Sequence, residues 1–159
     1  MMWERIERQL VSEPSGRAVI ERYIELMNRN EFSRLNEVLH PDCVEELPQS
    51  GERFRGLAAI RATRENYPGE LQAQRIRQLN LTGGQERWAV TPNFTTVRIT
   101  GEDDRFSYVL TTTYPDGSDW HLIAFVDLRD GLIAKATVYF APTFPAPDWR
   151  APYREPLES

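Results

Sequence analysis

The sequence predicts an α+β domain in which helices come first and an antiparallel sheet follows. Up to about residue 67, apolar residues recur every three or four positions, which is helical spacing. After about residue 72, they alternate with polar residues, and turn segments rich in glycine, proline or aspartate separate the runs. Helices must cover one face of such a sheet, and a strongly bent sheet leaves a cavity between the two layers.

The helical half divides at turn signals. A short helix is expected at residues 3–10, before the interruption at 14–16. A strongly amphipathic helix follows at 19–27, with Ser15 as its candidate cap. A second amphipathic segment at 32–39 is expected to end before Pro41, because a proline disfavours helical geometry in the residue before it. A short strand at 43–48, a turn at Ser50-Gly51 and a helix from Leu57 to about residue 66 complete this half.

The second half is expected to form five strands. Asp130-Gly131 is the best tight-hairpin signal, and Pro92 indicates an edge strand or a bulge. The domain is expected to span residues 1–141. The tail at 142–159, rich in proline and aromatic residues, is expected to be extended and to lie across the domain or a partner subunit. The strands are expected at 72–82, 88–100, 106–114, 119–129 and 132–140.

Composition excludes several classes of function. The 159 residues carry a net charge of −5, and no cluster of Lys and Arg forms a basic footprint, so we expect no nucleic-acid partner. The single cysteine, Cys43, cannot form an internal disulfide, and the spacings of thiol metal sites are absent. His40 and His121 are far apart in sequence without an acidic triad, and no Gly-rich phosphate loop precedes a helix, so we expect no metal and no cofactor. No apolar run approaches the ~20 residues of a membrane span, and the first eleven residues lack a signal-peptide core. We therefore expect a cytoplasmic protein without a membrane partner.

Several segments resemble a known superfamily. They are RYIEL at 22–26, LHPDCVEE at 39–46, SGE at 50–52, and the closing hairpin FVDLRDGLI at 125–133 with the residues up to 140. Together they resemble the nuclear transport factor 2-like superfamily, most closely its SnoaL-like polyketide cyclase branch, which is kin to the ketosteroid isomerases. The resemblance implies a cone-shaped α+β barrel, with the curved sheet wrapped around N-terminal helices to enclose a pocket. This fold hosts cyclases, isomerases, dehydratases and non-catalytic binders.

The catalytic positions of the ketosteroid isomerases are matched only in part. Tyr23 occupies the position of their pocket tyrosine. The position of their general base falls on Leu47, which cannot take a proton, although a one-residue slip would bring Glu46 there. The position of their second oxyanion donor falls on His121. The resemblance therefore argues against steroid isomerisation. The Arg-x-Asp pair of the superfamily's epoxide hydrolases is also absent at Arg98.

His121 is the first candidate for chemistry. On a strand it shares one face with Ile123, Phe125 and Asp127. If that face is concave, a neutral imidazole in a dry pocket can act as general acid or base near neutral pH. Asp127 would orient or move protons, since apolar walls raise the pKa of a carboxyl group. The alternative for His121 is a core histidine hydrogen-bonded to the backbone, or a partly exposed one. The alternative for Asp127 is an ordinary surface charge paired with a basic neighbour.

Glu45 and Glu46 are adjacent, so only one of them can face the pocket. Gapless register favours Glu45, on the face of Leu47, and the slipped register favours Glu46. The alternative is a pair of solvated charges near Arg53 or Arg55. The hydroxyl of Tyr23 either donates into the cavity or finds a backbone partner.

A wall of apolar and aromatic side chains would suit a flat hydrophobic ligand. Trp120 and Tyr139 have the opposite parity and are expected on the outer sheet face, where the resemblance implies a homodimer interface. The residues expected to line the pocket, besides Tyr23 and Glu45, are Leu47, Trp88, Phe94, Tyr108, Ile123, Phe125 and Phe140.

Two functional hypotheses follow. The first is a cofactor-independent enzyme of the cyclase or isomerase type, which moves protons next to the carbonyl of a small hydrophobic substrate. In it, His121 and Asp127 are catalytic, with Tyr23 or a glutamate of the 45–46 pair assisting. The second is a binding or dimerisation module that uses the same pocket without chemistry. The pKa of His121, and its response to ligands, would separate the two hypotheses.

Overall fold

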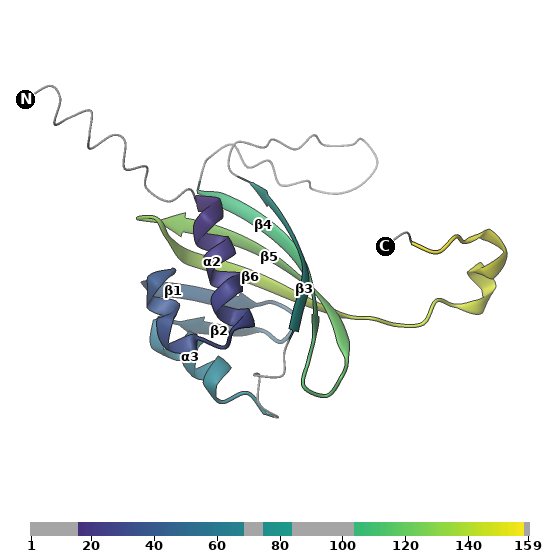
Figure 1. Ribbon diagram of the computed structural model, residues 1–159, viewed down its shortest axis with the longest axis horizontal. Helices are drawn as coiled ribbons and strands as arrows, with labels where there is room; N and C mark the ends of the chain where they lie inside the picture. The colour runs from purple at the N-terminus through teal and green to yellow at the C-terminus, as the bar shows by residue number, and fades with distance from the viewer. Residues whose placement is uncertain (1–15, 69–74, 84–103, 158–159) are drawn as a thin grey trace, which may run out of the picture.

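The computed structural model describes residues 16–68, 75–83 and 104–157. A strongly curved sheet wraps around helix α2 (Gly16–Asn28), and α3 (Leu57–Glu65) lies beside β1 and β2 at one end of the sheet (Figure 1). The α+β layout expected from the sequence is confirmed. The helix expected at 3–10 and the strand expected at 88–100 lie outside the described residues.

Helix α2 covers the concave face of the sheet. Its start lies very close to the sheet, because a Cβ atom added at Gly16 would come 2.7 Å from Cε2 of Phe106 and 2.8 Å from Cδ1 of Leu128. Its end is closed by Asn30, whose φ of 58° is left-handed. The residues that α2 buries follow the helical spacing predicted from the sequence; they are Val19, Ile20, Tyr23, Ile24, Leu26 and Met27.

The segment after α2 departs from the expectation. The predicted helix at 32–39 is a shorter 3-10 helix, η1 (Phe32–Glu37). Strand β1 (Leu39–Leu47) already begins at Leu39 and runs through Pro41, four residues earlier than predicted. The short strand β2 (Glu52–Arg55), which antiparallel pairing joins to β1, had no strand signal of its own in four mostly polar residues. Helix α3 ends before Tyr67-Pro68, as predicted.

The six strands that the described residues contain form one sheet in the order β2-β1-β6-β5-β4-β3. Strands β3 (Arg75–Gly83), β4 (Arg105–Thr113), β5 (Asp119–Arg129) and β6 (Leu132–Pro142) are antiparallel neighbours. The pairing of β1 with β6 is parallel, so the expectation of a purely antiparallel sheet is wrong at this pair. The β5–β6 turn is the predicted tight hairpin: Asp130 and Gly131 have φ of 54° and 72°, as a type I′ turn requires.

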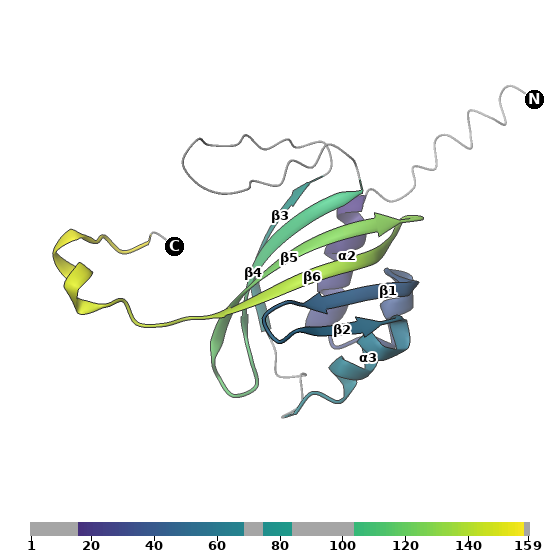
Figure 2. The ribbon, with the colours of Figure 1, turned by 180° about the vertical axis from the view of Figure 1, so that it is seen from behind.

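The two faces of the sheet differ in burial. On the concave face β4 buries Phe106, Tyr108, Leu110 and Thr112, and β5 buries Ala124, Val126 and Leu128. Figure 2 shows the opposite face, over which no described helix lies. The core therefore lies between α2 and the concave face. The same region also contains a cavity, which is described below.

The tail beyond β6 projects away from the rest of the chain in both views (Figures 1 and 2). It contains one short 3-10 helix, η3 (Asp148–Tyr153), and its large apolar side chains are exposed, from 70% for Trp149 to 99% for Leu157. The tail therefore does not lie across its own domain. No helix in the described ranges is long and apolar enough to cross a membrane.

Candidate functional site: a cavity with a buried ion pair

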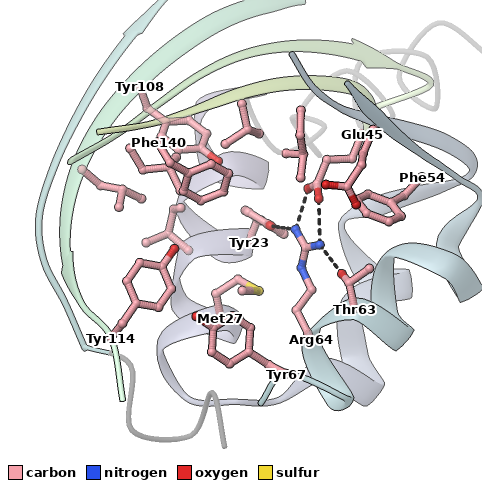
Figure 3. A pocket seen from close by; sticks show the side chains of 16 residues that line it. Tyr23, Met27, Glu45, Phe54, Thr63, Arg64, Tyr67, Tyr108, Tyr114 and Phe140 are labelled. Atoms are coloured by element: carbon pink, nitrogen blue, oxygen red, sulfur yellow. Dashed lines mark hydrogen bonds and ion pairs between the residues drawn. The ribbon is translucent and has the colours of Figure 1, made fainter. Parts of the chain in front are cut away.

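A cavity of about 370 Å³ lies between α2, α3 and the concave face of the sheet. Most of its wall is apolar or aromatic, and Figure 3 shows a small polar cluster on one side, where Glu45, Arg64 and Tyr23 converge. The lining residues are Tyr23, Ile24, Met27, Glu45, Leu47, Glu52, Phe54, Thr63, Arg64, Tyr67, Tyr108, Leu110, Tyr114, Leu122, Val138 and Phe140.

The polar cluster is centred on an ion pair between β1 and α3. Nη1 of Arg64 donates to Oε1 of Glu45 at 2.8 Å, and Nη2 donates to Oε2 at 2.5 Å. This is a bidentate arrangement of a guanidinium and a carboxylate. The two side chains are only 12% and 9% exposed. Because a buried charge is stable only with a partner, each group holds the other in place.

Arg64 also contacts two hydroxyl groups. Its Nη1 donates to Oγ1 of Thr63 at 2.7 Å, and its Nη2 donates to the hydroxyl oxygen of Tyr23 at 3.1 Å. Burial by itself would lower the pKa of Arg64, but Tyr23 and Glu45 raise that pKa well above the usual value. The guanidinium is therefore charged at any pH at which the protein is folded.

Tyr23 reaches this cluster from the buried face of α2. Burial raises the pKa of Tyr23 above its usual value, although the neighbouring Arg64 opposes the rise. The phenol is consequently protonated at neutral pH. Since its oxygen accepts a hydrogen bond from Arg64, its own hydrogen is left to donate to another acceptor. A ligand oxygen in the cavity would be such an acceptor.

Three further tyrosines enclose the apolar part of the cavity. Tyr108 lies on β4 and is 5% exposed. Tyr114 follows the same strand, and its ring stacks on that of Tyr67 with centroids 5.9 Å apart. Burial raises the pKa of Tyr108 well above the usual value and that of Tyr114 to about 12. Flat apolar surfaces with protonated hydroxyls therefore surround the space facing the ion pair (Figure 3).

These raised pKa values predict a loss of stability in alkali. An unfolded tyrosine loses its proton near pH 10, whereas folded Tyr114 does so near 12. The stabilisation is thus complete below pH ~10 and falls as pH rises from ~10 to ~12, because the unfolded state then binds fewer protons. We expect Tyr114→Phe to reduce this fall by about 2 kcal/mol, measured by urea unfolding at a series of pH values.

The tail supplies a matched control for the alkaline experiment. Tyr153→Phe removes a phenol that is 84% exposed in the folded protein, so the variant should show the same pH dependence as the parent. An unchanged slope in Tyr114→Phe would contradict the prediction.

An open groove of about 480 Å³ adjoins the cavity. The cavity and the groove share Leu47, Tyr67, Tyr114 and Phe140 in their walls. The far side of the groove is polar and includes Gln49, Ser50, Asp116 and Ser118. Hydrogen bonds from the hydroxyl and the backbone N–H of Ser118 lower the pKa of Asp116, which is therefore ionised at neutral pH.

The inward placement expected for His121 and Asp127 is wrong. His121 is exposed on the outer face of β5, and the inward side chains of this strand are its neighbours Leu122, Ala124 and Val126. Asp127 lies on the outer face as well, 3.8 Å from Nε of Arg105. The inward side chains of β5 are all apolar, whereas the outward side chains, which include His121, are partly charged. The strand therefore buries its more hydrophobic face, and not the face that alignment with the ketosteroid isomerases assigns to the pocket.

Other expected site residues also face outward. Glu46 pairs with Arg53 at 3.0 Å and lies 3.6 Å from Lys135, so Glu45 is the inward member of the pair. Ile123 is 37% exposed, and the ring of Phe125 packs edge-to-face on Tyr139 of the outer face. Tyr139 has the outward position expected from its parity.

Trp120 departs from its expected position. It packs edge-to-face on Tyr114 with centroids 6.0 Å apart and lines the groove, so the prediction that it lies on the outer face is wrong. Trp88 and Phe94 lie outside the described residues. Five of the expected residues do line the cavity: Tyr23, Glu45, Leu47, Tyr108 and Phe140. Their contact with a ligand stays a prediction.

Sequence reasoning missed Arg64, the centre of the polar cluster. A signal was present, because Ile60 and Arg64 are four residues apart and lie on one face of the predicted helix. A basic residue on a buried helix face needs an acidic partner, and Glu45 has the inward parity on β1. Within 16–68, 75–83 and 104–157, no group of three or more His, Cys, Asp or Glu could hold a metal ion.

Comparison with known proteins identifies a family to which the sequence is similar. The sequence model of the SnoaL-like domain matches residues 20–136. An NTF2-like protein of unknown function from Burkholderia xenovorans LB400 has a TM-score of 0.67 at 20% identity, over 91% of this chain and 96% of that one. A candidate ketosteroid isomerase from Kribbella flavida has a TM-score of 0.64 at 21% sequence identity, over 91% of each chain.

A candidate polyketide cyclase from Xanthomonas campestris is also similar, with a TM-score of 0.52 at 23% identity over 80% of this chain and 90% of that one. At such identities the similarity shows a shared fold, while function rests on the site. No curated protein matches the sequence.

Proposed function

We propose that the cavity of this chain, which belongs to the SnoaL-like domain family, binds a small hydrophobic molecule. The molecule would carry an acceptor oxygen such as a carbonyl. The observation that carries the proposal is the Tyr23 hydroxyl, which accepts from Arg64 at 3.1 Å and has its own hydrogen left to donate at the border between the polar cluster and the mostly apolar wall. Known small-molecule sites combine such a wall with a few placed polar groups.

The placement of Tyr23 favours an oxygen acceptor over a purely apolar ligand. A protonated phenol that donates to nothing inside a closed site loses a hydrogen bond it would make in water, which costs about 1–3 kcal/mol. A carbonyl oxygen near Tyr23 restores that bond. The positive charge of Arg64 on the phenol oxygen strengthens the donor, because hydrogen bonds in a chain polarise one another. A flat ring system would meanwhile occupy the space beside Tyr108 and Tyr114.

Matched ligands test this proposal. We expect 2-acetylnaphthalene to bind more tightly than naphthalene, as measured by calorimetry. In Tyr23→Phe the affinity for the ketone should fall about 3–10-fold, the worth of one hydrogen bond, while the affinity for naphthalene should not fall, because phenylalanine leaves no unpaired hydroxyl beside an apolar ligand. Tyr153→Phe removes a hydroxyl from the exposed tail, away from the cavity, and serves as the control. Equal losses for both ligands in Tyr23→Phe would show that the hydroxyl does not contact the oxygen.

A second candidate function is proton transfer next to the bound carbonyl, as in an isomerase or cyclase. It is favoured by Glu45, which among the described residues is the carboxylate held deep in the wall beside Tyr23 and Arg64. Tyr23 would stabilise the developing enolate oxygen, and Glu45 would take the α-proton. Both oxygens of Glu45 already accept hydrogen bonds from Arg64 and are therefore occupied in this arrangement, so we place binding before chemistry.

Hydrogen exchange separates the two functions. In D2O, an acid-base enzyme would exchange the methyl hydrogens of 2-acetylnaphthalene, visible as loss of the proton signal in NMR spectra. Tyr23→Phe should slow that exchange by a factor beyond its loss of affinity, whereas a pure binding module would leave the exchange at the rate in buffer.

We also propose that a second copy of the chain covers the outer sheet face. Val109, Ile123 and Tyr139 pair across β4, β5 and β6 in a single rung, and they are 37–40% exposed. Phe125 packs beside Tyr139, so the rung extends into an apolar patch. A patch at the centre of a bare sheet face suits a two-fold interface, in which the same surface meets itself.

Ile123→Asp should convert the expected dimer to a monomer, because two carboxylates would face each other across the two-fold axis. Sedimentation equilibrium measures this change. Ala58→Asp adds the same charge to an exposed position of α3 and should leave the dimer intact. A monomeric parent protein at tens of micromolar would refute the dimer.

A further inference from the structure

The charges that line the cavity and its groove are mainly negative. Among the described residues, Arg64 is the one basic side chain in either wall. Glu45 and Glu52 line the cavity, and Asp116 lines the groove. The described part of these walls, with one positive and three negative groups, has a net charge of −2, so an anionic ligand enters against the local field.

The two terminal nitrogens of Arg64 are fully engaged by the protein. Its Nη1 donates to Glu45 and Thr63, and its Nη2 donates to Glu45 and Tyr23. Each terminal nitrogen of a guanidinium carries two hydrogens, so all four of them have protein acceptors. Glu45 occupies the edge of Arg64 formed by Nη1 and Nη2, and an incoming carboxylate would meet a like charge there.

We infer that the cavity selects uncharged carbonyl compounds, such as ketones, aldehydes, esters or amides, and rejects the corresponding carboxylic acids. This inference rests on the proposed function, because it assigns the chemical class of ligand to the same site. An uncharged carbonyl oxygen can accept from Tyr23 without a counter-ion. A carboxylate would leave water for a mostly apolar wall in which the basic side chain among the described residues, Arg64, is already paired with Glu45, and burial of an unpaired charge is strongly unfavourable.

The groove strengthens this selection. Asp116, ionised at neutral pH, lies in its polar wall with Gln49 and Ser118. A ligand long enough to reach from the cavity into the groove would therefore place hydroxyl or amino groups there, since Asp116 accepts hydrogen bonds and attracts positive charge. The expected ligand is neutral at its carbonyl end and neutral or cationic at its other end.

Three ligands of the same ring system test the inference on the unmodified protein. 2-Acetylnaphthalene and 2-naphthamide are uncharged, whereas 2-naphthoate carries a carboxylate of nearly the same shape. At pH 7.5 we expect the ketone and the amide to bind at least tenfold more tightly than the naphthoate, as measured by calorimetry. If naphthoate binds as tightly as the amide, the inference is overturned while the proposed function stands. If none of the three binds, the proposed function itself fails.

The variant Glu45→Gln is expected to increase the affinity of the cavity for a carboxylate ligand. The substitution keeps the shape of the side chain but removes the charge that neutralises Arg64, so naphthoate affinity should rise at least tenfold. The matched control is Glu46→Gln, the same change one residue along β1, where the side chain pairs with Arg53 on the outer face. Circular dichroism and thermal unfolding establish that each variant is folded. A folded Glu45→Gln protein without increased naphthoate affinity would contradict the inference.

Discussion

Arg64→Met is expected to lower the free energy of unfolding by about 3–5 kcal/mol, which is the range measured when one partner of a buried ion pair is removed. The substitution leaves the carboxylate of Glu45 only 9% exposed and without its bidentate donor. It also removes the donor to the hydroxyl oxygen of Tyr23. Urea unfolding, followed by circular dichroism, measures the change.

Two variants establish that the cause is the unpaired charge. Arg61→Met, on the same helix, breaks an exposed pair with Glu65 and should change stability by no more than about 1 kcal/mol. Combining Arg64→Met with Glu45→Leu removes both buried charges and should recover much of the loss, because apolar side chains of similar volume can replace a buried ion pair. A double variant less stable than Arg64→Met alone would contradict this account.

Leu26→Ala is expected to cost about 2–5 kcal/mol, the range for truncation of a fully buried leucine. Leu26 is 0% exposed and is one of the core residues that α2 buries. Alanine has the higher helix propensity, so the loss reports the cavity left in the core rather than a weakened helix. Chemical unfolding measures it.

The tail provides the matched position for this substitution. Leu157 is 99% exposed, and Leu157→Ala should stay within about 0.5 kcal/mol of the parent. A loss below 1 kcal/mol in Leu26→Ala would indicate that the core around α2 closes over the missing side chain, in which case the position of Tyr23 in the cavity is less rigid than the structure implies.

The arrangement of the polar cluster bears on the family resemblance. Leu47 lines the cavity at the position where the resemblance implies a general base, and Glu45 lies two residues earlier on the same face of β1. The site therefore has an inward carboxylate, but one that is paired with Arg64 instead of being open to a substrate. Tyr23, the position that does match, is the group best placed to contact a ligand.

Periodicity predicted the elements well wherever one face of an element is uniformly apolar. The 3.6-residue spacing of Val19, Ile20, Tyr23 and Met27 placed α2, and Asp130-Gly131 placed the closing hairpin, because both signals are local. Strand β5 was harder to interpret, since Ile123 and Phe125 on its outer face are as apolar as Leu122 and Val126 on its inner face. The family register then selected the wrong face for His121.

By itself, the sequence determined the α+β layout, the helix that carries Tyr23 and the strand that carries Glu45, because apolar spacing and turn residues act over a few neighbouring positions. Only the tertiary structure decided that Arg64, nineteen residues beyond Glu45, closes an ion pair with it and leaves the Tyr23 hydrogen free to donate. The ion pair depends on how α3 packs against β1 and on the parallel β1–β6 pairing, which turns Glu45 inward. Contacts of this kind arise from long-range packing, which local patterns do not encode.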